Sequence, residues 1–182
     1  MKEKIAIIGG GLSGSLLAIC LAKRGAQVEL YERRGDIRKG QADAGRSINL
    51  ALSTRGIEAL KRVGLAEQVL KDAIPMNGRM MHSLDGQLTY QAYGKEGQYI
   101  NSVSRSLLNI KLLELADEFD NVNILFKQKC VSVDLNKNTA VMENEHGEQK
   151  TTTADILFGS DGSFSAVRSE MQKTSRFSYS QT

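Results

Sequence analysis

Short apolar runs alternate with glycine-containing turns at the start of this chain of 182 residues. The first run, KIAII at residues 4–8, is continuous, which is typical of a strand covered on both faces. Residues 12–24 carry apolar side chains at helical spacing, and Gly25 would end that helix. The run QVELYE at residues 27–32 predicts a second strand. The chain is therefore expected to begin with a βαβ unit.

The middle of the chain has weaker patterns. Residues 33–47 are polar and contain glycine, so they predict a loop, whereas the apolar stretch at residues 47–53 is ambiguous. Gly64 separates two short helical patterns, and Pro75, the only proline, would close this region. These two expected helices span residues 54–63 and 65–73.

A hairpin is expected next, because Asp85-Gly86 separates two runs with alternating apolar residues. Ser104 is then a plausible N-cap for a helix that continues to about Phe119. Its expected apolar face consists of Leu107, Leu108, Leu112, Leu113 and Leu115. Short strands follow, and the last of them ends in a turn before a helical segment. These elements are expected at residues 123–126, 130–135, 139–144, 150–153, 154–162 and 164–171.

Composition and charge exclude several function classes. The net charge of +3 is spread along the chain, with basic residues alternating with acidic ones, so nucleic-acid binding is not expected. Cys20 and Cys130 are far apart and form no CxxC motif, which argues against a metal site and demands no oxidising compartment. All apolar runs are shorter than the roughly 18 residues that a membrane helix needs. We therefore expect a chain without a membrane segment in a reducing, cytoplasmic setting.

The first turn carries the strongest chemical signal, the spacing Gly9-x-Gly11-x-x-Gly14 between a strand and a helix. Gly9 permits the tight turn, Gly11 lets the backbone approach a pyrophosphate, and Gly14 lets helix and strand pack closely. The pyrophosphate would lie at the helix N-terminus. Glu32, at the end of the second strand, would accept hydrogen bonds from ribose hydroxyls and repel a 2′-phosphate. The motif predicts NAD or the ADP half of FAD, but not NADPH, and does not separate the first two.

Several further stretches, together with GGGLSG, resemble the flavoprotein aromatic hydroxylases. They are GRSINLALSTRG at residues 45–56, GRMMHSLDG at 78–86, AYGKEGQYINSVSR at 92–105 and ADILFGSDGSFSAVRS at 154–169. The resemblance covers essentially all 182 residues but only the N-terminal part of those longer enzymes. It implies an α/β fold, a Rossmann-like FAD-binding βαβ domain with an inserted β-hairpin region, incomplete relative to the family. Residues 1–182 would be the N-terminal part of that domain and would include the start of a substrate-binding region at about 75–103.

The resemblance also implies which residues bind FAD and substrate. Arg79 matches the family arginine that holds the carboxylate of an amino-acid substrate, and Tyr93 matches the tyrosine whose hydroxyl reaches the same carboxylate. A guanidinium suits this role because it makes two parallel, charge-assisted hydrogen bonds. The cofactor residues implied are Gly9, Gly11, Ser13, Gly14, Glu32, Arg33, Arg34, Ala51, Arg105, Cys130, Asp161 and Gly162.

The activity implied is an FAD-dependent hydroxylation of L-kynurenine to 3-hydroxykynurenine in tryptophan degradation, which consumes NADPH and O2. The flavin carries the chemistry, so no protein acid, base or nucleophile is assigned. NADPH would bind transiently, outside the glycine-rich site. The family completes its flavin site with a later Gly-Asp motif, whereas the only Gly-Asp here is Gly35-Asp36. Two alternatives therefore stay open: a nucleotide-binding or FAD-binding remnant without turnover, and another FAD- or NAD-dependent oxidoreductase.

Overall fold

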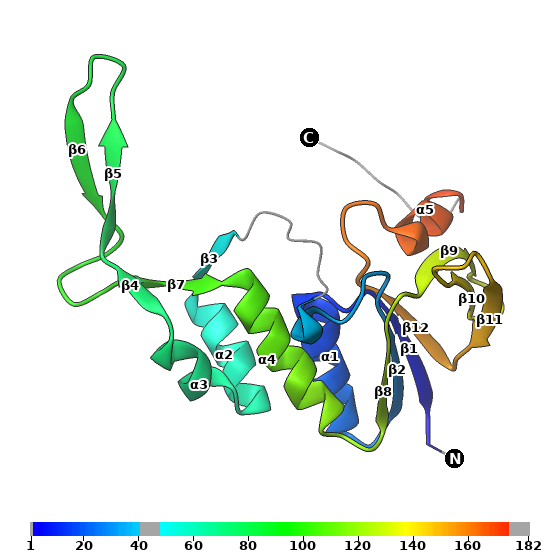
Figure 1. Cartoon of the computed structure of the whole chain (residues 1–182). Coiled ribbons are helices and arrows are strands. Elements are labelled where there is room, and N and C mark those ends of the chain that lie inside the picture. The colour runs from blue at the N-terminus through cyan, green and yellow to red at the C-terminus, as the bar shows by residue number, and fades with distance from the viewer. Residues whose placement is uncertain (1, 41–47, 175–182) are drawn as a thin grey trace. The chain divides into compact units, whose positions relative to one another are not determined.

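The computed structural model describes residues 2–40 and 48–174, which divide into two compact units (Figure 1). The first unit comprises residues 1–43 and 109–182, and the second comprises residues 44–108. The expected substrate-binding region at about 75–103 lies within the second unit. Each unit has two sheets of its own among the described residues, and each is described by itself.

A parallel four-stranded sheet forms the centre of the first unit, with the strand order β12-β1-β2-β8 (Figure 1). Helix α1 (Leu12–Ala22) connects the two inner strands. The expected βαβ unit is therefore confirmed. The strands are β1 (Lys4–Ile8), β2 (Gln27–Tyr31), β8 (Val122–Leu125) and β12 (Ile156–Gly159).

Both faces of β1 are buried, which explains its continuous apolar sequence. Ile5 and Ile7 pack on one face with Ala18 of α1. Ala6 and Ile8 pack on the other face, against an antiparallel sheet in the order β11-β10-β9. That sheet consists of β9 (Lys129–Asp134), β10 (Thr139–Glu143) and β11 (Gln149–Thr153). Helix α5 (Ala166–Gln172) follows β12 and buries Val167 in the same core.

The second unit contains the elements that were hardest to assign from sequence. The ambiguous stretch forms strand β3 (Asn49–Leu52), which pairs with β7 (Ile100–Ser104). Strand β4 (Ile74–Met76) pairs with the other side of β7. Pro75 follows the two helices, as expected, and lies within an edge strand, a position at which a sheet tolerates proline. The remaining elements are α2 (Thr54–Val63), α3 (Ala66–Lys71), β5 (Gly78–His82) and β6 (Leu88–Ala92).

Helix α4 (Arg105–Asp117) begins in the second unit and continues in the first. The hydroxyl of Ser104 accepts a hydrogen bond from the N–H of Leu107 at 3.4 Å, as expected for an N-cap. Leu108, Leu112 and Leu113 are buried, but Leu107 is 55% exposed, so its expected place on the apolar face was wrong. At about 100° per residue, the buried residues Leu108, Leu112, Leu113 and Ala116 fall within one arc of about 140°, and Leu107 lies outside that arc.

The expected loop at residues 33–47 contains a short 3-10 helix, η1 (Ile37–Lys39). Asp36 begins it by accepting from the N–H of Arg38 at 3.1 Å, and the two side chains also form an ion pair. The rest of that expected loop, residues 41–47, lies outside the described residues. None of the helices in the described ranges is long and apolar enough to cross a membrane.

Candidate cofactor and substrate sites

The turn between β1 and α1 needs glycine at two of the predicted positions. Gly9 has a φ of +107°, and a Cβ on it would lie 2.5 Å from the carbonyl oxygen of Ser160. A Cβ on Gly14 would lie 1.9 Å from the carbonyl oxygen of Gly9. Ser160 follows β12 and donates its hydroxyl to the same carbonyl oxygen at 2.8 Å. The ends of β1 and β12 and the start of α1 therefore pack too closely for side chains at these two glycines.

The N-terminus of α1 has the donors that an anion needs. Within residues 2–40 and 48–174, no acceptor binds the N–H groups of Gly11, Leu12 or Ser13, because the first helical bond runs from Ser15 to Gly11. The first turn carries no acidic residue. Among the described residues, a Cβ on Gly11 would meet nothing within 4 Å, so the space beside Gly11 is open. Free N–H groups facing open space suit a pyrophosphate.

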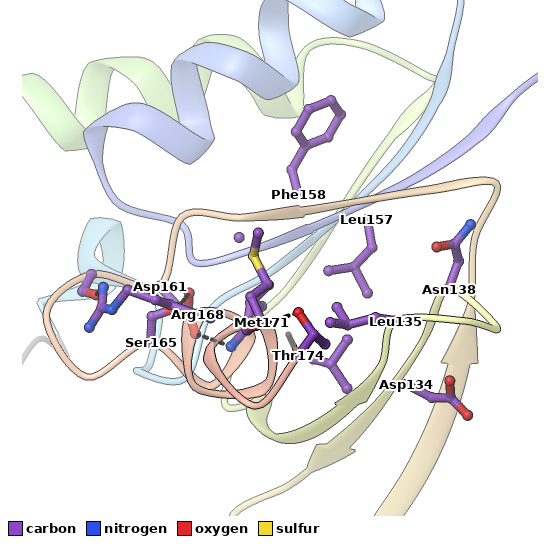
Figure 2. Close-up of a pocket in the computed structure, with 14 residues that line it drawn as sticks. Asp134, Leu135, Asn138, Leu157, Phe158, Asp161, Ser165, Arg168, Met171 and Thr174 are labelled. Carbon is purple, nitrogen blue, oxygen red and sulfur yellow. Dashed lines mark hydrogen bonds between the residues drawn. The ribbon is translucent and has the colours of Figure 1, made fainter. Parts of the chain in front are cut away.

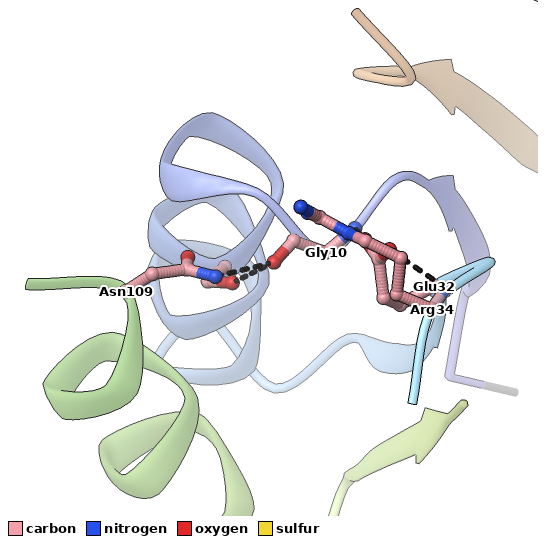
Figure 3. A network of polar contacts seen from close by, with 5 residues as sticks. Gly10, Glu32, Arg34 and Asn109 are labelled. Atoms are coloured by element: carbon pink, nitrogen blue, oxygen red, sulfur yellow. Dashed lines mark hydrogen bonds and ion pairs between the residues drawn. The ribbon is translucent and has the colours of Figure 1, made fainter. Parts of the chain in front are cut away.

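Glu32 is 6% exposed and lies directly after β2, beside this turn. Its Oε2 accepts from the N–H of Gly10 at 2.9 Å, and its Oε1 accepts from the backbone N–H and the Nε of Arg34, each at 2.9 Å (Figure 3). Each carboxylate oxygen has two acceptor sites, so Oε2 has capacity for one more donor. Arg33 is exposed, and the side chain of Arg34 is half exposed at its ion pair with Glu32.

Two residues that the sequence analysis missed contact the same turn. Asn109 of α4 donates from Nδ2 to the carbonyl oxygen of Gly10 at 3.2 Å, and the hydroxyl of Ser15 donates to that oxygen at 3.1 Å. Both side chains are buried. The only signal for Asn109 was one amide within the apolar run SLLNIKLL, which does not reveal its partner 99 residues earlier.

Cys130 and Asp161 lie close enough to interact electrostatically, on β9 and after β12. Burial raises the pKa of the Cys130 thiol to about 11, and the negative charge of Asp161 adds to this shift. The carboxylate of Asp161 also has a structural role. It accepts from the hydroxyl of Ser165 at 2.6 Å and from the N–H of Ala166 at 2.7 Å, at the start of α5. Gly162 follows with a φ of +80° in an exposed turn.

A groove of about 640 Å³ opens between β9, β12 and α5 (Figure 2). Asp161 and Gly162 line it together with the apolar side chains of Leu157 and Met171. Arg168 also lines it and donates from Nη1 to the carbonyl oxygen of Gly162 at 3.1 Å. The residues of the glycine turn are not part of this lining, so the groove and the turn are separate features of the first unit.

The β5–β6 hairpin of the second unit places both expected substrate residues on one face. Arg79 pairs directly with Gln91, and the N–H of Tyr93 donates to the carbonyl oxygen of Asn77 at 2.9 Å. Because alternate residues share a face, Arg79, Gln91 and Tyr93 are neighbours on it. The Nε of Arg79 donates to Oε1 of Gln91 at 2.8 Å, and neither terminal nitrogen of the guanidinium bonds to another of the described residues. The side chains of Arg79 and Tyr93 are exposed.

Two expected flavin contacts, Ala51 and Arg105, both belong to the second unit. Ala51 is exposed on β3, opposite Ser102 of β7. Arg105 is the exposed first residue of α4, and its N–H donates to the carbonyl oxygen of Ile48 at 3.3 Å. The other expected cofactor residues belong to the first unit.

Comparison with known proteins identifies the family. The model of the FAD binding domain family matches residues 2–180. Kynurenine 3-monooxygenase of Myxococcus xanthus is 47% identical over 97% of this chain, and that of Sus scrofa is 43% identical over 99% of it. The chain spans 38% of the length of each of these relatives.

Solved structures agree on the fold. The crystal structure of the flavin-dependent monooxygenase PieE in complex with FAD and substrate superposes with a TM-score of 0.77 at 22% identity, covering 94% of this chain and 32% of that one. The Rossmann-like α/β fold and the resemblance to the flavoprotein aromatic hydroxylases are thereby confirmed. The chain belongs to the family of FAD-binding domains.

Proposed function

We propose that this chain is the FAD-binding part of a flavin-dependent aromatic hydroxylase that converts L-kynurenine to 3-hydroxykynurenine with NADPH and O2. The identity of 47% to a kynurenine 3-monooxygenase along 97% of the chain is the observation that carries the proposal. Residues 1–182 would form the N-terminal part of the FAD-binding domain, with the start of the substrate region at about 75–103. The cytoplasmic setting expected from the cysteines stays a prediction.

The first unit has groups that fit the ADP half of FAD. The free N–H groups at Gly11 and Ser13 would bind the pyrophosphate, because they face open space at a helix N-terminus. The spare acceptor capacity of Glu32 Oε2 would bind a ribose hydroxyl. Arg33 and Arg34 would flank the adenosine. Further contacts proposed for the cofactor are those of Gly9, Gly14, Ala51, Arg105, Cys130, Asp161 and Gly162.

The second unit has groups that fit the carboxylate of an amino acid. The two terminal nitrogens of Arg79 can donate in parallel to both carboxylate oxygens, since Gln91 occupies only its Nε. The hydroxyl of Tyr93, on the same hairpin face, would donate to the same carboxylate. Bound FAD would supply the redox chemistry that uses NADPH and O2. The protein side chains proposed here bind and orient the cofactor and the substrate.

The purified chain tests this proposal. We expect a yellow protein after reconstitution with FAD, oxidation of NADPH that L-kynurenine stimulates, and a product heavier than kynurenine by one oxygen atom in mass spectrometry. Flavin binding without product would favour the alternative of a remnant without turnover. Product formation from another aromatic substrate, with none from kynurenine, would favour a different oxidoreductase. Absence of flavin and of ADP binding would contradict the cofactor site itself.

A further inference from the structure

We propose that Asn109 is a positioning residue for the bound cofactor: its side-chain amide fixes the carbonyl of Gly10, so that the N–H of Gly11 points at the pyrophosphate. This inference rests on the proposed FAD site and adds a residue from α4 to it. Asn109 would act through the backbone of the turn, without touching the pyrophosphate.

The peptide groups of Gly10 are held from two sides. On one side, Asn109 Nδ2 and the hydroxyl of Ser15 donate to its carbonyl oxygen at 3.2 and 3.1 Å. On the other side, its N–H donates to Glu32 Oε2 at 2.9 Å. Figure 3 shows Asn109 on the side of Gly10 opposite Glu32 and Arg34. The orientation of this residue is therefore set by side chains from two helices and from the end of β2.

Fixing that carbonyl also fixes the donor that follows it. The described chain contains no cis peptide bond, and in a planar trans peptide the C=O and the next N–H point in opposite directions. The N–H of Gly11 therefore points away from Asn109. It has no acceptor among the described residues, and the space around Gly11 is open. Because consecutive glycines rotate easily about φ and ψ, this N–H needs an external contact to keep one direction.

The burial of Asn109 supports a role beyond packing. The residue is 8% exposed, and its Oδ1 is buried with no hydrogen-bond partner within the described part of the chain. A buried acceptor without a partner is unfavourable and needs an explanation. Leu108, Leu112 and Leu113 are buried around it on α4, so a leucine would suit the packing better. The hydrogen bond to Gly10 is what the amide provides and a leucine would not.

Two substitutions test the proposal, Asn109→Leu and Asn109→Asp, because both remove the donor to Gly10 and keep the approximate side-chain size. Asn121→Leu is the matched control. Its Nδ2 donates to the carbonyl oxygens of Ala22 and Ala26 at 2.9 and 2.7 Å, after the other end of α1. ADP and adenosine are the probes, measured by calorimetry, with ³¹P spectra of bound ADP and the thermal midpoint of each apo variant.

We expect both Asn109 variants to bind ADP about ten-fold more weakly, because the N–H of Gly11 would lose its fixed direction and with it one hydrogen bond to the charged pyrophosphate, while adenosine binding changes little. The ³¹P resonances of bound ADP should shift in both variants. Asn121→Leu should lower the thermal midpoint and leave the ratio of ADP to adenosine affinity unchanged. If Asn109→Leu does not fold, the double variant Ser15→Ala, Asn109→Asp replaces it. This variant removes both side-chain donors to the carbonyl of Gly10 and should weaken ADP binding further.

Three results would overturn the inference. Unchanged ADP affinity and unchanged ³¹P resonances in both Asn109 variants would show that the amide does not position the turn. Equal losses for ADP and adenosine would show that Asn109 only supports the structure. If the unsubstituted chain bound neither ADP nor FAD, the proposed function itself would fail, and the inference with it.

Discussion

The backbone N–H of Gly10 lies 2.9 Å from Oε2 of Glu32, so the carboxylate expected to bind ribose also holds the turn expected to bind phosphate. The same carboxylate binds Arg34 through its other oxygen. One buried side chain therefore links the end of β2 to the β1–α1 turn. Changes at Glu32 should affect both halves of the ADP site at once.

Glu32→Gln is the first test of this link. Glutamine keeps one acceptor but loses the charge that binds Arg34 and disfavours a 2′-phosphate. We expect ADP affinity to fall about 10- to 100-fold, since hydrogen bonds to a charged group contribute roughly 1.5–3 kcal/mol. The preference for ADP over its 2′-phosphorylated form should narrow. Calorimetry with both nucleotides measures the two affinities. The control is Glu145→Gln, which removes a carboxylate from an exposed ion pair with Lys127. A preference that stays unchanged would contradict the role of Glu32 in excluding the 2′-phosphate.

Arg79→Ala tests the carboxylate site on the hairpin. We expect L-kynurenine to bind the FAD-loaded chain about 10- to 100-fold more weakly, because two charge-assisted hydrogen bonds are lost. FAD affinity should stay within about two-fold. Kynuramine, which lacks the carboxylate, should bind the variant and the parent protein equally. Gln91→Leu should have a smaller effect in the same direction, because it frees the Nε of Arg79 but leaves the guanidinium in place.

Arg55→Ala, an exposed arginine on α2 of the same unit, is the control for charge. Parallel losses of FAD and kynurenine affinity in Arg79→Ala would assign Arg79 to the fold of the hairpin and not to the substrate.

Local patterns predicted the glycine turn and the acidic residue beside it. Gly9 and Gly14 are closely packed and Glu32 bonds to the turn, while the binding roles of these residues stay predictions. Asn109 and Ser160 could not be found in this way. They meet the same turn from positions 99 and 151 residues away in sequence, and their chemistry depends on tertiary packing.

In the second unit, the strand register and the order of strands within the sheets could not be predicted from the sequence. Asp85-Gly86 predicted the hairpin correctly, although the turn has three residues, with Gly86 at a φ of +83°. The pairing of the hairpin, continued by the hydrogen bond from Tyr93 to Asn77, then places Arg79 and Tyr93 on one face. Pro75 follows the two helices as expected, but sequence alone does not predict that it lies within the edge strand β4. Periodicity identifies elements, whereas the positions of strands within a sheet depend on distant pairing.

The thiol of Cys130 should react slowly at neutral pH. Burial, with the charge of Asp161 as the second cause, raises its pKa to about 11, so the reactive thiolate is scarce below that value. In a Cys20→Ser background, the rate of alkylation should rise with a midpoint near pH 11, against about 8.5 for a free thiol. Asp161→Asn should move the midpoint to lower pH, and bound ADP should slow the reaction if this stretch encloses adenine.

The control is Asp134→Asn. It removes a carboxylate from β9, the strand of Cys130, but Asp134 does not contribute to the raised pKa of the Cys130 thiol. A midpoint near that of a free thiol, or one that Asp161→Asn does not move, would contradict the placement of Cys130 beside Asp161.

Tyr31 should make the fold sensitive to alkaline pH. Its hydroxyl is 2.7 Å from Glu29 Oε2 and 2.9 Å from Thr152 Oγ1, and burial is the main cause that raises its pKa to about 12. The pKa of Tyr31 in the folded protein lies above its unfolded value of about 10. The free energy of unfolding therefore includes the full contribution of the protonated Tyr31 below pH 10, and this contribution is lost as the pH rises toward 12.

At pH 8, Tyr31→Phe should lower the free energy of unfolding by about 1 kcal/mol, the net value of a lost hydrogen bond. Between pH 10 and 12 the parent protein alone should lose about 2 kcal/mol, so the order of stability should reverse. Urea unfolding at several pH values measures both free energies, and Tyr90→Phe, on the exposed hairpin, is the control. A difference between parent and Tyr31→Phe that stays constant from pH 8 to 12 would show that the buried tyrosine is not the group that titrates.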